Sequence, residues 1–308
     1  MSNHKFGVQD LRIEAMDKVN DSPVVVSVII PCYNCADSVG DQLAALADQA
    51  FDQPWEVLIV DNGSQDDLAA ALAPFEGRLP GLRVVMATDA RGSAHARNVG
   101  AKAARGRILL FADADDVVGA GWLRAMVTAL EQHEFVACRM DFEKLNPGGR
   151  ARSSIQQTGL QNYTYPDFLP HAAGGTLGVR REVHEAVSGF DTTMLRLQDT
   201  DYCWRIQLAG HDMSFVPDAV IHYRLRETLR DTWRQAFKYG EYNVKLYQLY
   251  QNKGMGKITV RRGLRGWYYL VRQVPRLFRA DERGRFVWSM AWRFGRLYGS
   301  LRYRVFAL

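Results

Sequence analysis

The sequence predicts an α/β fold with a doubly wound, mostly parallel sheet and a C-terminal amphipathic helical extension. Two observations predict the sheet. Short, continuous apolar runs, typical of strands buried on both faces, alternate with helical patterns over about 90 residues from Val24 onward. Turn-forming and acidic residues follow these runs directly, as at the carboxyl edge of a parallel sheet. The extension is predicted from aromatic residues and arginines that recur at helical spacing after residue 255.

The first half of the predicted sheet consists of four apolar runs, at 24–30, 55–60, 82–86 and 108–111. Pro31 ends the first run, and a helical stripe follows it with Asp37 as its N-cap. Asp66 and Asp67 open a second helix. A third helix, within 91–106, is rich in alanine, which allows close packing. The crossovers between these parallel strands are expected to be right-handed.

The second half of the sheet region has weaker signals and no internal repeat. We expect, in order, a helix at 122–132, a strand at 135–142, a loop at 146–161, helices at 181–187 and 202–208, and short strands at 214–216 and 219–222. The loop is expected because this stretch is rich in Gly, Ser and Gln.

Length and composition exclude several classes of protein. The 308 residues suffice for one large domain with an appendage, or for two domains. No stretch approaches 18 consecutive apolar residues, so no membrane span is predicted. Residues 1–22 mix charge and polarity, which favours an N-terminal tail over a secretory signal.

Reduced cysteines in a cytoplasmic protein are therefore expected. Cys32 and Cys35 have C-x-x-C spacing, which leaves a redox or metal role as the alternative.

Positive charge is concentrated in the extension. Residues 255–308 contain 13 basic and two acidic residues, a net charge of +11, whereas the whole chain carries +5. A basic helix with an aromatic stripe commonly lies in a membrane interface, where each basic residue near anionic headgroups adds about 1 kcal/mol. The alternatives are packing on the rest of the chain and a homodimer seam. Nucleic acid binding is not expected, because the aromatic residues follow a helical stripe rather than a stacking platform.

Three carboxylates follow the predicted strand at 108–111. Asp113, Asp115 and Asp116 would repel one another where a buried strand leaves the core. A divalent cation would remove this conflict, since Mg²⁺ and Mn²⁺ prefer oxygen ligands. The alternative is a solvated acidic turn that opens the helix near Gly121.

The turn after the first strand lacks the usual phosphate-binding loops. A dinucleotide-binding domain would carry G-x-G-x-x-G there, whereas this chain has Pro31-Cys32-Tyr33-Asn34. A nucleotide could still bind through its base and ribose, with Asp61 accepting hydrogen bonds.

Five segments together resemble glycosyltransferase family 2. They are VSVIIPCYN (26–34), EVLIVDNGSQDD (56–67), RGSAHARNVGAKAARGRILLFADADD (91–116), RREVHEAVSGFD (180–191) and QDTDYCWR (198–205). The resemblance implies an inverting enzyme with the A-type nucleotide-sugar fold. It implies a catalytic domain at 23–230, divided into a nucleotide-binding half (23–116) and an acceptor-binding half (117–230), before the helical extension (231–308).

The resemblance also implies roles for individual residues. The implied nucleotide-binding residues are Pro31, Tyr33, Asn34, Asp61, Arg97 and Asp113. The implied ligands of Mn²⁺ or Mg²⁺ are Asp115, Asp113 and His222, and Asp199 matches the catalytic base. The family usually has Glu-Asp at the base, whereas this chain has Gln198-Asp199, which removes one negative charge beside it. Gly174, Gly175 and Asp201 are expected to contact the donor sugar or the acceptor.

Each of the main residues has a structural alternative. Asp61 lies in a good turn sequence, Asp-Asn-Gly-Ser. Asp199 could cap a helix, His222 could be a hydrogen-bonded strand residue, and Arg97 could pair with an acid.

The predicted function is inverting, metal-dependent transfer of a single sugar from a nucleoside diphosphate sugar, with a UDP-sugar as the first choice. The predicted acceptor is a glycan or a lipid-linked acceptor, and the predicted location is the inner face of the membrane. The chain lacks the Gln-x-x-Arg-Trp signature of processive synthases. The alternatives are a catalytically silent nucleotide-sugar-binding scaffold and a sugar nucleotidyltransferase, although the Gly-rich basic loop of the latter is missing.

Overall fold

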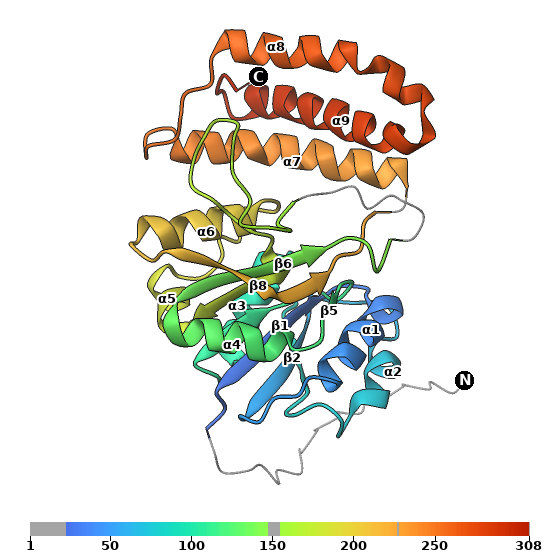
Figure 1. Cartoon of the computed structure of the whole chain (residues 1–308), viewed down its shortest axis with the longest axis vertical. Coiled ribbons are helices and arrows are strands. Elements are labelled where there is room, and N and C mark those ends of the chain that lie inside the picture. The colour runs from blue at the N-terminus through green and yellow to red at the C-terminus, as the bar shows by residue number, and fades with distance from the viewer. Residues whose placement is uncertain (1–22, 147–154, 227, 308) are drawn as a thin grey trace, which may run out of the picture.

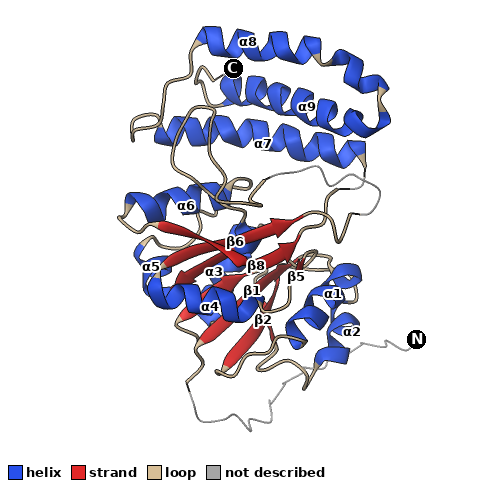
Figure 2. Cartoon of the chain, viewed as in Figure 1, coloured by secondary structure: helices blue, strands red, loops and turns tan. Residues whose placement is uncertain are grey.

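A computed structural model describes residues 23–146, 155–226 and 228–307. The predicted N-terminal tail (1–22) and part of the predicted loop (147–154) lie outside the described residues. A sheet with helices on both faces forms the larger part of the described chain, and a layer of three long helices stacks at one end of it (Figures 1 and 2).

The described strands form one eight-stranded sheet in the order β3-β2-β1-β4-β7-β6-β8-β5. The first half is parallel and consists of β1 (Val26–Cys32), β2 (Trp55–Asp61), β3 (Arg83–Met86) and β4 (Ile108–Phe111). The second half is mixed and consists of β5 (Val117–Val118), β6 (Phe135–Asp141), β7 (Leu177–Arg180) and β8 (Met213–His222). Strand β7 runs antiparallel to both β4 and β6. The predicted α/β class is confirmed.

Helices cover both faces of the sheet. One face packs on α1 (Ala36–Ala47), α2 (Leu68–Leu72) and α4 (Trp122–Gln132), and the other on α3 (Ser93–Ala103), α5 (Arg181–Ala186) and α6 (Gln198–Leu208). The central strands are buried on both sides, which is why they are continuous apolar runs. Helix α3 approaches closely at Gly100, where a Cβ atom would lie 2.5 Å from Ile29 and 2.7 Å from Val60.

Several elements differ from the prediction. Helix α1 begins at Ala36, so Asp37 lies in its first turn and is not the N-cap. The two strands predicted at 214–216 and 219–222 form one strand, β8, which contains a bulge opposite Cys138 and Arg139. Strands β5 and β7 are absent from the predicted elements, because β5 has two residues and Gly178 interrupts the apolar run of β7.

A buried carboxylate joins the amino ends of the first strands. Glu56 accepts hydrogen bonds from Ser27 Oγ (2.7 Å) and the Arg105 N–H (2.6 Å). The guanidinium groups of Arg83 and Arg105 lie 3.2 and 3.0 Å from it. Burial opposes the charge, but these donors and cations outweigh it and hold the pKa of Glu56 below its ordinary value. This network stabilises the end of the sheet opposite to the predicted site.

The C-terminal layer consists of α7 (Leu229–Tyr250), α8 (Val260–Arg272) and α9 (Ala280–Arg302), with a 3₁₀ helix, η3 (Val274–Phe278), after α8. Aromatic rings join it to α6, since Trp204 contacts Tyr250 of α7 at 5.0 Å and Phe168 at 4.8 Å between ring centroids. Helices α7 and α9 pack backbone to backbone at Gly240 and Gly295, where a Cβ atom would overlap a carbonyl oxygen of the other helix.

Helix α8 has an exposed apolar face. Val260, Leu264, Tyr268 and Val271 are 58%, 63%, 58% and 67% exposed. We call these four residues the α8 stripe. They are three or four residues apart and therefore share one side of the helix. Exposed arginines flank the stripe at positions 261, 265 and 272. None of the described helices has the length and apolar content needed to cross a bilayer.

Candidate active site

The turns after β1 and β2 are bound to each other at the carboxyl edge of the sheet. Cys32 and Asp61, the last residues of these strands, are register partners. Asp61 is almost buried and accepts a hydrogen bond from the Ser64 N–H (2.8 Å). Asn34, in the left-handed region at φ +50°, accepts from the Gln65 N–H (2.8 Å) and donates its own N–H to Ser64 Oγ (3.0 Å). These bonds hold the loops after β1 and β2 in one conformation.

The other predicted residues of this turn differ in exposure. Tyr33 is half exposed, so its ring is accessible to a ligand. Pro31 lies within β1 rather than after it, and it contributes to the shape of the strand end. Cys32 and Cys35 are buried free thiols. Hydrogen bonding with Cys35 and burial raise the pKa of the Cys32 thiol well above its ordinary value, which opposes thiolate chemistry.

Asn62 connects β2 to the start of α3. Its side-chain oxygen accepts a hydrogen bond from the Gly92 N–H (2.8 Å), and its amide donates to the carbonyls of Ala87 and Ala90. Asn62 is not among the predicted site residues. The sequence signal was its position between Asp61 and Gly63, which is also the signal of an ordinary turn.

Arg97 and Asp113 form an ion pair at the centre of the site. Arg97 Nη2 donates to Asp113 Oδ1 at 2.5 Å, and the arginine is 2% exposed. The Nε and Nη1 atoms of Arg97 have no hydrogen-bond partner among the described residues. Gly174 and Gly175 lie against this pair. A Cβ atom at Gly174 would be 3.0 Å from the Arg97 guanidinium, and one at Gly175 would be 2.8 Å from the Asp113 carboxyl group.

Asp199 lies in the first turn of α6 and contacts the same glycines. It accepts hydrogen bonds from the Gly174 N–H (3.0 Å) and the Thr200 N–H (2.9 Å). Burial raises the pKa of Asp199 above its ordinary value, although Arg97 and these two N–H groups oppose the shift. The N-cap residue of α6 is Leu197, so the predicted capping alternative for Asp199 does not apply.

Helix α7 brings an unpredicted tyrosine to this region. Burial, and then the charge of Asp199, raise the pKa of the Tyr239 phenol. Gln235 Nε2 donates to the phenol oxygen at 3.5 Å, and the Trp288 ring lies edge-on at 5.7 Å between centroids. Tyr239 is distant from Asp199 in sequence and lies in the helical extension, so no motif pointed to it.

The remaining acids after β4 are held by two arginines. Asp115 pairs with Arg226 (3.3 Å), and Asp116 accepts from the Arg224 N–H (3.0 Å). Burial and neighbouring carboxylates, Asp113 first, raise the pKa of both Asp115 and Asp116. In the described part of the chain, no three His, Cys, Asp or Glu side chains converge as a metal site.

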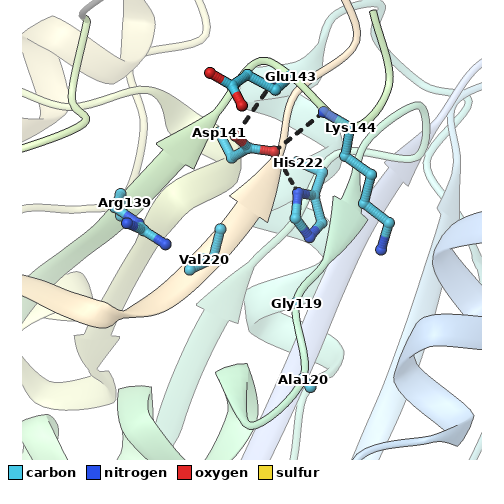
Figure 3. Close-up of a pocket in the computed structure, with 8 residues that line it drawn as sticks. All are labelled: Gly119, Ala120, Arg139, Asp141, Glu143, Lys144, Val220 and His222. Atoms are coloured by element: carbon cyan, nitrogen blue, oxygen red, sulfur yellow. Dashed lines mark hydrogen bonds and ion pairs between the residues drawn. The ribbon is translucent and has the colours of Figure 1, made fainter. Parts of the chain in front are cut away.

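His222, the predicted third metal ligand, is therefore not clustered with Asp113 and Asp115. Its Nδ1 atom lies 2.6 Å from Asp141 Oδ2, at the ends of paired strands β8 and β6. Figure 3 shows this pair in an open pocket of about 590 Å³, which Arg139 and Lys144 also line. None of the predicted acids after β4 lines this pocket.

Asp201, which was predicted to contact the donor sugar or the acceptor, forms hydrogen bonds within the fold. The residue is buried, and Arg205 Nε donates to its Oδ2 atom at 2.8 Å. The Tyr250 hydroxyl donates to its Oδ1 atom at 2.7 Å. Both carboxylate oxygens are thus occupied, and the residue connects α6 to α7.

Comparison with known proteins identifies the family. The profile of Glycosyl transferase family 2 matches residues 27–188, which is more than half of the chain. The chain belongs to glycosyltransferase family 2. The match confirms the resemblance in the sequence and contains the turns after β1 and β2, the Arg97–Asp113 pair and the two glycines.

Relatives of this family 2 glycosyltransferase include Glycosyltransferase AglE of Haloferax volcanii, which is 28% identical over 73% of the chain and 74% of AglE. The Pre-mycofactocin glycosyltransferase of Mycobacterium tuberculosis is 28% identical over 69% of the chain, which spans only 45% of that protein. The fold is similar to mannosyltransferase PcManGT from Pyrobaculum calidifontis, solved with GDP-Man and Mn²⁺ (TM-score 0.65, 20% identity, 90% of this chain and 89% of that one). It is also similar to S. aureus TarS 1–349, solved with UDP-GlcNAc. The TM-score is 0.54 at 17% identity, and the match covers 92% of this chain and 93% of that one.

Three charged groups of this glycosyltransferase therefore converge around one backbone turn. Arg97 and Asp113 lie against the positions that Cβ atoms at Gly174 and Gly175 would take, and Asp199 accepts a hydrogen bond from the Gly174 N–H. A carboxylate that can accept a proton is held beside an arginine with free donors. This arrangement can bind an anionic leaving group and remove a proton from an incoming hydroxyl.

Proposed function

We propose that the enzyme transfers one sugar, with inversion, from a nucleoside diphosphate sugar to a glycan or lipid-linked acceptor. The observation that carries the proposal is the contact of both Arg97 and Asp199 with Gly174. Inversion requires an in-line attack, in which the acceptor hydroxyl and the leaving diphosphate lie on opposite sides of the anomeric carbon. A base and an anion-binding group held at the same turn provide the two groups that this reaction needs close to one anomeric carbon.

Asp199 acts as the general base in this proposal. It accepts the proton of the acceptor hydroxyl while the hydroxyl oxygen bonds to the anomeric carbon and the bond to the diphosphate breaks. Its raised pKa makes the carboxylate a stronger base than an exposed aspartate. The free donors of Arg97 neutralise negative charge that develops on the leaving group.

Asp115 and Asp113 are the residues that would hold Mn²⁺ or Mg²⁺. Carboxylate oxygens are the preferred ligands of these cations, and the crowding that raises the pKa of Asp115 is relieved by a positive charge. The cation, when bound, supplies Lewis-acid stabilisation of the diphosphate. The nucleotide would lie against Tyr33, Asn34 and Asp61. Similar structures solved with UDP-GlcNAc and GDP-Man support a nucleoside diphosphate, and UDP is our first choice of base.

The test is Asp199→Asn, with Asp218→Asn as the matched change at an exposed aspartate. We expect Asp199→Asn to lower kcat by roughly 100-fold or more while the donor Kd, measured by calorimetry with Mn²⁺ present, stays within about twofold. A scaffold protein would show no transfer in the wild type, and a nucleotidyltransferase would release pyrophosphate. Undiminished transfer by the variant would refute the proposed base.

We further propose that the enzyme works at the inner face of the membrane, held there by the α8 stripe and its flanking arginines. Leu264→Ser with Val271→Ser should reduce flotation with anionic liposomes at least fivefold. Leu208→Ser, a change at an exposed leucine of α6, is the control. Equal flotation of all variants, or a stripe-dependent dimer in solution, would contradict this assignment.

A further inference from the structure

Two arginines that follow β8 contact the acids that follow β4. Arg224 donates from Nε to the Asp115 carbonyl (3.0 Å) and from its backbone N–H to Asp116 Oδ1 (3.0 Å). Its Nη2 atom donates to Asp41 of α1 at 3.0 Å. Among the described residues, none of these contacts involves the carboxylate of Asp115. Arg224 thus attaches the segment after β8 to the acidic turn and leaves that carboxylate to another partner.

Arg226 is that partner. Its Nη1 atom lies 3.3 Å from Asp115 Oδ2, and within the described chain this is the one side-chain contact of the Asp115 carboxylate. The Arg226 side chain is 52% exposed. An exposed ion pair of this kind is weak, because solvent screens it and two side chains lose freedom in forming it. The Arg226 guanidinium can therefore leave Asp115 at little cost.

Both proposed aspartate ligands of Mn²⁺ or Mg²⁺ already have a positively charged partner. Asp113 pairs with Arg97 at 2.5 Å, and Asp115 pairs with Arg226 at 3.3 Å. The Arg97 side chain is buried, whereas that of Arg226 is largely exposed, so Arg226 is the partner that can move. A cation that binds Asp115 must replace Arg226 or share the carboxylate with it, and sharing brings two positive charges together.

The alternative is that Arg226 only orients Asp115 for the cation. Asp115 is already held through its carbonyl by Arg224, so its position does not depend on the Arg226 pair. The two roles also predict opposite effects of removing Arg226. Loss of an orienting partner would weaken cation binding, whereas loss of a competing positive charge would strengthen it.

We propose that Arg226 competes with the divalent cation for Asp115 and thereby couples cation binding to binding of the nucleoside diphosphate. Without the nucleotide, both positive groups compete for one carboxylate, and the cation binds weakly. The diphosphate adds negative charge beside them, and an arginine fork matches phosphate oxygens, so Arg226 exchanges Asp115 for the diphosphate and the cation takes the carboxylate. Each ligand then raises the affinity for the other. The inference rests on the proposed function and names the residue on which this coupling depends.

The test is calorimetry on the full chain with Mn²⁺ and UDP as probes, each titrated alone and in the presence of the other, and with GDP in place of UDP if UDP does not bind. In the wild type, we expect UDP to raise the affinity for Mn²⁺ at least tenfold, and Mn²⁺ to raise the affinity for UDP by the same factor. In Arg226→Gln, Mn²⁺ alone should bind at least threefold more tightly, and the coupling factor should fall at least fivefold. Arg234→Gln, which removes an exposed arginine of α7 paired with Asp231, should match the wild type.

Unchanged or weaker binding of Mn²⁺ alone to Arg226→Gln, or an unchanged coupling factor, would overturn the proposal. Arg226→Lys keeps the charge without the fork, so it should keep the weak binding of Mn²⁺ alone and lose part of the coupling. Thermal unfolding confirms that each variant is folded. If Mn²⁺ binds no variant, with or without nucleotide, the coupling and the cation site are both refuted. The role of Asp199 is read from transfer kinetics, so its failure is distinguishable from failure of the coupling.

Discussion

At the scale of single residues, Gly174 and Gly175 determine how closely Arg97, Asp113 and Asp199 approach one another. Neither glycine has a positive φ, so their role is close approach rather than unusual backbone conformation. The Arg97 guanidinium and the Asp113 carboxyl group occupy the positions that side chains at 174 and 175 would need. The glycine N–H also holds Asp199. A methyl group here would move the reacting groups relative to each other.

Gly175→Ala should therefore lower kcat/KM at least tenfold, because small displacements of positioning groups are costly in rate. Its Cβ would lie 2.8 Å from the Asp113 carboxyl carbon and 3.0 Å from the Asp113 backbone nitrogen, which cannot move easily. Steady-state kinetics at saturating Mn²⁺ measures the effect. Gly159→Ala is the control, since nothing lies within 4 Å of its added Cβ. Normal turnover of Gly175→Ala would show that the Asp113 contact is unimportant.

Acids at strand ends were predictable from the sequence, because a carboxylate after a buried run is conspicuous. Asp61, Asp113 and Asp115 lie at the carboxyl edge of the sheet as expected. Tyr239 and Asn62 were not predictable, since one arrives through tertiary packing and the other resembles a turn residue. The bond of Asp201 to Tyr250 was not predictable, because the two residues are 49 positions apart.

At the element scale, the contact between α7 and α9 depends on residues without side chains. Gly240 faces the Trp292 carbonyl, and Gly295 faces the Phe237 carbonyl, so the helices touch through backbone. Arg302 and Lys238 close the contact around the buried Glu241. Helix α7 carries Tyr239, whose phenol is close enough to Asp199 for that charge to raise its pKa after burial, so this packing also positions the tyrosine.

Gly295→Ala should lower the free energy of unfolding by about 1–3 kcal/mol, because a methyl group would overlap the Phe237 carbonyl and force the helices apart. Urea unfolding measures this change. Gly284→Ala lies in the same helix with nothing within 4 Å of the added Cβ, so it should be neutral or stabilising. Equal stability of the two variants would contradict the close contact.

Strands with a largely apolar run were predictable, whereas those interrupted by glycine, proline or polar residues were not. Strands β1, β2 and β4 are continuous apolar runs that match the predicted segments closely. The prediction divided β8 into two strands because Pro217 and Asp218 interrupt the apolar pattern. In the structure, a bulge at this point lets one strand continue past them. Helical stripes at 264–278 and 286–301 were predictable from the aromatic and arginine spacing, as was a break at Pro275, but the bounds of the helices were not.

At the scale of the whole molecule, the buried His184 and the partly buried His171 connect stability to pH. Burial lowers the pKa of both His171 and His184 to about 4, from an ordinary value near 6.5. His184 is hydrogen-bonded to the Tyr202 hydroxyl at 2.8 Å and packs on Phe111 and Phe190. Both are neutral in the folded protein at pH 6, where the unfolded chain already binds protons.

Stability should therefore be full above pH 7 and fall as pH drops from 6.5 toward 4, since protons bind the unfolded state first. Each histidine contributes roughly 3 kcal/mol over its full shift. Urea unfolding at pH 7.5, 6.0 and 5.0 measures the trend, and His184→Gln should remove about half of the decrease. An unchanged pH dependence in that variant would mean that His184 is protonated in the folded state. Aspartates whose pKa is raised in the folded protein have the opposite effect, because their protonation stabilises the folded state as the pH falls. The difference between the wild type and His184→Gln isolates the contribution of the histidine.

The two margins of the sheet are short. Strand β3 at one margin has four residues and β5 at the other has two, so few backbone groups are left open for a further strand. Copies crowded together therefore gain little by edge-to-edge β-pairing, which is a common route to aggregation. The exposed helical surfaces of the described residues, such as that of α8, offer more area for association between copies than these margins do.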